Sequence, residues 1–169
     1  HLGIVPQTHQ RVTNFEDTLY YNRGDAKNVF VPPYDANLPG CVTGVDLMYR
    51  RTADGSYNYV PFASKLPITI SCFALTPRGA VVQMGRSAAI NTRTFYFCDT
   101  SNSGLARVDT DSIYLPLDAV QQMTAMSGEN PRVSALLLKF SAGVKLGDGV
   151  QRTQTLWNKF VESEAQSPF

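Results

Sequence analysis

The chain has 169 residues, of which 43% are apolar and 17% are charged, and its formal net charge is +1. A chain of this length can bury a core without a metal ion or disulfide, and the near-neutral charge excludes a strong, general electrostatic attraction to nucleic acid. The charged fraction is below the roughly 25% of an average globular domain, which is typical of a surface lying mostly against other protein, although a lectin-like sandwich has the same composition.

The first third of the chain predicts an arm followed by short strands. Residues 1–14 have no clear period and are expected to form an extended arm. Two strands are predicted around Thr18–Tyr21 and Asn28–Val31, separated by an Arg-Gly-Asp turn at 23–25. Such a triplet can bind integrins, but Gly and Asp are common turn residues, so the turn is the favoured interpretation. A further strand is expected from about Val42.

The next segment carries the strongest hairpin signal in the sequence. Asp54-Gly55 is flanked by Tyr49 on one side and by Tyr57 and Tyr59 on the other, as in a tight turn between two strands. The three tyrosines could form a platform on which a sugar stacks. Cross-strand tyrosines more often only stabilise the hairpin.

The middle of the chain alternates apolar and polar residues, as strands do. The segment 66–75 has apolar residues on both faces, which predicts a strand covered on both sides. Further strands are expected in 80–85, 92–100 and 111–117. About eight strands at intervals of 10–20 residues favour an antiparallel sandwich or barrel.

The last third begins with a different period. Asp118 can cap a short helix over 118–127 whose Val120, Met123 and Met126 share one face. After Asn130-Pro131 comes an aliphatic segment over 133–140, which we predict to be a strand. The segment 152–163 fits either a helix or a strand, and we predict a strand because a closing sandwich needs a partner for 133–140.

Few residues suggest chemistry. Cys41, Cys72 and Cys98 lack CxxC spacing and are expected to be reduced thiols in a cytoplasmic setting. Pairing of His9 with Cys41 is the only formal arrangement for a cysteine nucleophile, and a buried or loop thiol is the favoured alternative. With two histidines, His1 and His9, a zinc site is not expected.

Other classes of site are also not expected. Asp109 and Asp111 flank Thr110 on one strand face or in one loop and could bind calcium between subunits, but a solvated loop is favoured because calcium needs more oxygen ligands. There is no Gly-x-Ser-x-Gly motif, no phosphate-binding glycine loop, no membrane-length apolar run and no signal-peptide pattern. We therefore predict no enzyme, cofactor, metal or membrane partner.

Three pieces of the last third carry a resemblance: "PLDAVQQM" (116–123), "NPRV" (130–133) and "ALLLKF" (135–140). Strand, Pro-Leu-acid, short helix, Asn-Pro-Arg and aliphatic strand in this order resemble the second half of jelly-roll coat proteins of small icosahedral plant viruses. The resemblance covers residues 15–162 at the level of pattern. It implies an all-β fold, an eight-stranded antiparallel jelly roll with one short helix near 118–127. It also implies one domain over 15–162, with a tail at 163–169.

The implied function is that of a structural coat protein of a non-enveloped RNA virus, assembling with itself or with sister coat proteins into an icosahedral shell around RNA. Many such coats, bromoviruses among them, begin with an Arg/Lys-rich arm, which is not found here. The picorna-like group, including the small coat proteins of plant secoviruses, lacks that arm and is cut from a polyprotein. The first residue, His1, is expected for such a product, for another processed chain or for a fragment.

The resemblance also implies partners and a location. We expect other coat subunits as partners, weak and nonspecific contact with RNA, and localisation in the virion and, during assembly, in the host cytoplasm. The polar side of the 118–127 helix, with Gln121, Gln122 and Thr124, suits a contact between subunits, although the helix could merely cap the domain. The alternative function is a carbohydrate- or receptor-binding sandwich, such as a capsid protrusion.

Overall fold

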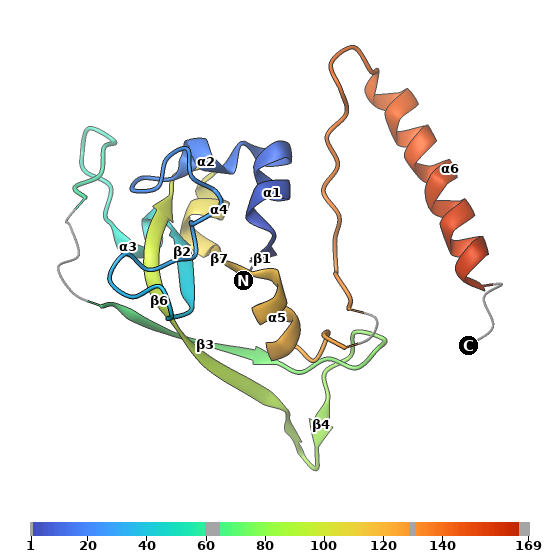
Figure 1. The fold of residues 1–169 in the computed structure, drawn as a ribbon, viewed down its shortest axis with the longest axis horizontal. Helices are drawn as coiled ribbons and strands as arrows, with labels where there is room; N and C mark the ends of the chain where they lie inside the picture. The colour runs from blue at the N-terminus through green and yellow to red at the C-terminus, as the bar shows by residue number, and fades with distance from the viewer. Residues whose placement is uncertain (1, 60–64, 129–130, 166–169) are drawn as a thin grey trace. The chain divides into compact units, whose positions relative to one another are not determined.

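The computed structural model describes residues 2–59, 65–128 and 131–165. By its internal contacts the chain divides into two compact units, a first unit of residues 1–136 and a second unit of residues 137–169. The first unit contains a five-stranded sheet with helices packed on it, and the second contains one long helix preceded by extended chain (Figure 1).

The strands found in the described residues are β1 (Leu2–Ile4), β2 (Gly40–Gly44), β3 (Pro67–Phe73), β4 (Gln83–Met84), β5 (Ser87–Ala88), β6 (Ile90–Ser101) and β7 (Ile113–Pro116). The helices are α1 (Pro6–Thr13), α2 (Phe15–Thr18), α3 (Val45–Met48), α4 (Ala106–Asp111), α5 (Leu117–Met123) and α6 (Leu146–Ala165). The main sheet has the strand order β1-β7-β2-β6-β3, and β4 and β5 form a separate two-stranded ribbon.

The main sheet mixes both strand directions. Strand β1 runs parallel to β7, and β2 runs parallel to β6. The pairs β2–β7 and β3–β6 are antiparallel. The predicted all-β antiparallel jelly roll is therefore wrong, because that fold has no parallel pairs and the chain contains several helices besides the one expected.

The first unit has a core on each face of its sheet. One cluster includes Val42 and Tyr114, and the other includes Cys41 and Leu115. Neighbouring residues in a strand point to opposite faces, so the two clusters lie on opposite sides of β2 and β7. Val108 of α4 packs against the first cluster, whereas α5 contributes to the second through buried side chains, which are Ala119 and Met123.

The predicted strands near the N-terminus are replaced by helix and turns. Residues 15–18 form α2, and 27–30 form turns, where strands were predicted around Thr18–Tyr21 and Asn28–Val31. The extended arm predicted for 1–14 contains β1 and α1 instead. Pro6 stands in the first turn of α1, where its missing N–H costs little, and Asn14 ends the helix in a left-handed conformation with φ of 55°. The β-branched and aromatic residues that suggested strands in these segments pack in the core instead of pairing in a sheet.

Other predicted elements are confirmed. Strands β2, β3, β6 and β7 lie where the alternation predicted them, and α5 accounts for most of the helix expected at 118–127, ending at Met123. Strand β3 differs in its burial, because Ile70 is 2% exposed while Phe73 on its other face is 51% exposed. Its predicted coverage on both sides is therefore wrong.

The second unit overturns two strand predictions. Residues 152–163 belong to α6, whose apolar residues recur every three or four positions from Leu146 to Val161. Residues 133–140 bend at Ser134 and form no strand with any described residue. The ring of Phe140 lies so close to Gly149 of α6 that a Cβ there would be 2.8 Å from it. Glycine at this position lets the extended chain approach the helix.

Candidate functional site

A buried carboxylate organises the surface richest in aromatic side chains. Asp99 of β6 is fully buried. Its oxygens accept hydrogen bonds from the backbone N–H groups of Tyr20 (3.1 Å), Tyr21 (2.9 Å) and Asn22 (2.7 Å), and also from the Asn22 side chain and the Thr100 N–H. Donors from the backbone can stabilise a buried charge without a cation. Asp99 thus fixes the backbone from which two tyrosines project.

These two tyrosines join the three that the sequence singled out. We name the group of Tyr20, Tyr21, Tyr49, Tyr57 and Tyr59 the tyrosine surface. The rings of Tyr20 and Tyr59 are stacked, with centroids 3.6 Å apart and an angle of 13° between their planes. Tyr49 meets Tyr59 edge to face at 5.0 Å, and its hydroxyl lies 3.2 Å from that of Tyr21. Tyr20 and Tyr21 are 47% and 41% exposed.

A polar network borders the tyrosine surface. The Tyr57 hydroxyl donates to Asp46 Oδ1 (2.7 Å) and accepts from Arg51 Nε (3.1 Å) and Nη2 (2.8 Å). Burial, followed by the bond to Asp46, raises the pKa of Tyr57, and burial raises that of Tyr49. These phenols therefore remain protonated donors at neutral pH. Charged groups beside exposed rings form a surface that can both stack on a ligand and hydrogen-bond to it.

The structure brings together the residues predicted from the hairpin. A turn at Asp54-Gly55, with Gly55 at φ of +85°, reverses the chain, and Arg51 pairs with Tyr57 as an isolated bridge. The sequence did not indicate Tyr20 and Tyr21 as partners, because the group that positions them, Asp99, is 79 positions from Tyr20. The only local feature that distinguishes Tyr20 and Tyr21 in the sequence is that the two tyrosines are adjacent.

The acidic pair considered for calcium does not converge. Asp109 and Asp111 lie on α4, not on a strand or in a loop as predicted. Asp109 is fully buried and accepts hydrogen bonds from Ser103 N–H (2.8 Å), Ser103 Oγ (2.8 Å) and Gly104 N–H (3.0 Å), whereas Asp111 is exposed. Asp109 therefore has the structural task of holding the loop before α4.

The cysteine and histidine considered for catalysis lie on opposite faces of the sheet. His9 packs edge to face on Phe15, with ring centroids 5.4 Å apart, and Cys41 belongs to the cluster on the opposite face. Burial raises the pKa of Cys41 to about 12 and does the same for Cys98. A neutral thiol is a poor nucleophile. All three cysteines are free thiols, and Cys72 is the least buried.

The polar side of α5 is engaged within the chain. Gln121 Nε2 donates to the backbone oxygen of Arg132 (2.9 Å), and Gln122 Oε1 accepts from Arg93 Nη1 (3.4 Å). A shallow hollow of about 300 Å³ lies where β1 and β7 meet the start of α5, with Asp118 and Gln121 in its lining. These contacts give both glutamines a structural role, and their role in assembly stays a prediction.

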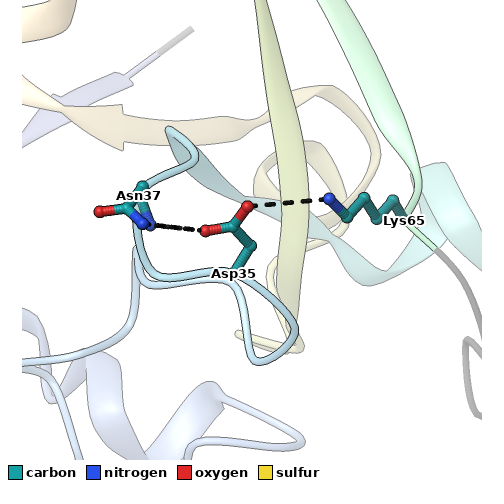
Figure 2. A network of polar contacts seen from close by, with 3 residues as sticks. All are labelled: Asp35, Asn37 and Lys65. Atoms are coloured by element: carbon teal, nitrogen blue, oxygen red, sulfur yellow. Dashed lines mark hydrogen bonds and ion pairs between the residues drawn. The ribbon is translucent and has the colours of Figure 1, made fainter.

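Two exposed loops carry small polar networks. The Asp35 carboxylate accepts from the backbone and side chain of Asn37 and lies 3.7 Å from Lys65 Nζ, tying the loop before β2 to the chain that enters β3 (Figure 2). The Arg-Gly-Asp turn is confirmed, with Asp25 N–H bonded to Asn22 O and Gly24 at φ of +85°. Asp25 itself accepts hydrogen bonds from Asn28.

The second feature of functional interest is apolar exposure near the C-terminus. Eleven large apolar residues from 133 to 161 are 40–72% exposed, and the buried apolar core of the described residues ends at Met123. They are Val133, Leu136, Leu137, Leu138, Val144, Leu146, Val150, Leu156, Trp157, Phe160 and Val161. Where such residues gather on one face of an element, as they do on α6, the exposure is typical of an interaction surface.

No family model, curated protein or solved structure matches this chain. Of the helices in the described residues, none combines the length and apolar character needed to cross a bilayer. In the same part of the chain, no three His, Cys, Asp or Glu side chains are grouped so that they could hold a metal ion.

Proposed function

We propose that this chain is a structural subunit that assembles with other protein chains through its second unit. The observation that carries the proposal is the uncovered apolar face of α6. Val150, Trp157, Phe160 and Val161 lie on one side of the helix, and each is about half exposed. Fully burying one such side chain stabilises a protein by roughly 1.5–3 kcal/mol, so covering this face is a large driving force for association.

The specific form of this proposal is a coat subunit of a small non-enveloped RNA virus, with copies of itself or sister coat proteins as partners. The jelly roll that the resemblance implied is wrong, so this form rests on the low charge of the chain and on its apolar second unit. With a net charge of +1, contact with RNA is proposed to be weak, nonspecific and only shallowly dependent on salt.

The single tryptophan of the chain, Trp157 on α6, supplies a direct test. We expect its fluorescence emission to move to shorter wavelength as protein concentration rises, because association would bury a ring that is 52% exposed. Sedimentation analysis should show the mass rising over the same concentration range. A monomeric mass at all concentrations together with short-wavelength emission would show that the face is covered within the chain, and the proposal would fail.

Matched variants of α6 separate the apolar face from the helix itself. Val150→Ala/Phe160→Ala should weaken association while keeping Trp157 as the reporter. Gln151→Ala/Thr155→Ala changes the polar side of the same helix, away from this face, and should associate like the unmodified chain. Equal association of the two double variants would mean that the apolar face is not the contact.

The tyrosine surface supports a second function, binding of a carbohydrate ligand. The favouring observation is the exposure of Tyr20, stacked on Tyr59, beside the Arg51–Tyr57–Asp46 network. Sugar C–H groups pack on aromatic faces while their hydroxyls need charged or amide partners. A glycan screen should then give hits that Tyr20→Ala loses and Tyr34→Ala keeps, since Tyr34 is 38% exposed but lies outside the surface. Equal loss in both variants, or no hits, would refute this function.

A further inference from the structure

The outer edge of β3 is open. β3 is the last strand in the sheet order, and its outer side pairs with no strand among the described residues. Its seven residues, "PITISCF", include no charged side chain. Charges on an edge strand normally prevent pairing with another chain, so this edge lacks the usual protection.

The register identifies which groups of β3 face outward. Just beyond its ends, Phe97 N–H donates to Leu66 O (3.0 Å) and Ala74 N–H donates to Ala89 O (2.9 Å). Hydrogen-bonded pairs alternate along an antiparallel ladder, so the even-numbered residues between these points bond to β6. Thr69 and Ser71 therefore direct their N–H and C=O groups away from β6. Pro67 also occupies an outward position, where its missing N–H breaks no bond to β6.

An unpaired aliphatic segment begins close to this edge. Residues 133–138, "VSALLL", are exposed and uncharged, bend at Ser134, and pair with no strand of the described chain. The preceding residue is firmly held, because Arg132 Nη1 donates to Thr76 O (3.0 Å) and Nη2 to Ala125 O (3.0 Å). Thr76 follows β3 by three positions, so the aliphatic segment starts near the C-terminal end of that strand.

We propose that residues 133–138 of one copy pair with the β3 edge of a second copy, which returns the same contact. Each copy offers one open edge and one unpaired segment of similar length, so a reciprocal exchange about a two-fold axis satisfies both. Neither partner carries a charge that would repel the other. This inference rests on the proposed assembly function and adds to the α6 face a second contact, between β3 and residues 133–138, with a second copy of the chain as the partner.

The test blocks each half of the contact separately. Ser71→Pro removes an outward N–H from the edge, and Leu137→Pro removes one from the segment. Each variant alone should associate about tenfold or more weakly than the unmodified chain in sedimentation analysis. Mixing the two should restore a mixed dimer with one strand pair, because the edge-blocked copy still has a segment to donate and the segment-blocked copy still has an edge.

Controls keep the outcome interpretable. Ser71→Ala and Leu137→Ala retain the N–H groups and should associate normally. Far-UV circular dichroism must show that the proline variants are folded, and Thr69→Pro, at the next outward position, replaces Ser71→Pro if that variant is not. If the unmodified chain associates and the mixture shows no rescue, or if the blocked variants pair normally, strand exchange is refuted while assembly stands. If the unmodified chain stays monomeric, both proposals fail.

Discussion

The two units of this chain differ in how far their large apolar residues are buried. In the first unit a core cluster lies on each face of the sheet, and residues such as Phe95 and Leu115 are fully buried. In the second unit the amphipathic helix α6 leaves Trp157 and Phe160 about half exposed. Most of the stability of a helix in a protein comes from packing of its amphipathic face, and the 20-residue α6 has such a face. This difference in burial supports the proposal that the second unit associates with another protein surface.

The units also differ in their buried polar groups. Asp99 and Asp109 are fully buried in the first unit and are held by backbone donors. In the second unit the side-chain hydrogen bonds of α6 are local, such as Thr153 Oγ1 to Gly149 O and Gln154 to Asn158. Long-range polar contacts therefore fix the first unit, whereas these hydrogen bonds of α6 stabilise the helix itself.

The largest expected effect comes from removing the carboxylate that ties loop to sheet. Asp99→Ala should lower the free energy of unfolding by roughly 5 kcal/mol, because several N–H donors would lose their acceptor in a buried site. Urea denaturation followed by far-UV circular dichroism measures the loss. Asp111→Ala is the control, since Asp111 is exposed, and should change stability by less than about 0.5 kcal/mol. A similarly small change in the free energy of unfolding for both variants would show that Asp99 does not anchor the loop to the sheet.

A pair of phenylalanines tests the comparison of the two units directly. Phe95 is 0% exposed and Phe160 is 55% exposed. Phe95→Ala should cost roughly 3–5 kcal/mol, because the cavity lies in a packed core. Phe160→Ala should change the stability of the dilute chain by less than about 0.5 kcal/mol. If Phe160→Ala costs as much as Phe95→Ala in dilute solution, the second unit has a core of its own and the contrast is wrong.

The sequence predicted the elements whose signal is local. The alternation in 66–75 predicted β3, and Asp54-Gly55 predicted the turn beside Tyr57. Sequence patterns did not predict features that depend on contacts between distant residues, because the anchoring of Tyr20 to Asp99 has no local signature. The segment 152–163 was ambiguous because Thr153, Thr155 and Trp157 alternate like a strand, and only the longer spacing from Leu146 through Val150 to Trp157 resolves it as a helix.

Two glycines at the start of α6 test how the second unit is held together. Gly147 has open space where a Cβ would lie, whereas a Cβ at Gly149 would be 2.8 Å from the Phe140 ring. Gly147→Ala should stabilise the helix by about 0.5–1 kcal/mol, the usual gain for alanine over glycine. Gly149→Ala should gain less, because the Phe140 ring must move. Helix content measured against temperature gives both values, and equal gains would mean that the Phe140 contact contributes nothing.

The smallest effect is expected at the surface of the first unit, where Lys65 Nζ lies 3.7 Å from Asp35 (Figure 2). The two side chains are 54% and 34% exposed. An ion pair this exposed is screened by water and salt and is usually worth well under 1 kcal/mol. A double-mutant cycle with Asp35→Ala and Lys65→Ala should therefore give a coupling below about 0.5 kcal/mol that falls as salt is added. The cycle is needed because Asp35→Ala alone also removes the hydrogen bonds from Asn37. A coupling above about 2 kcal/mol would mean that this exposed ion pair stabilises the first unit substantially, so that burial is not the only source of its stability.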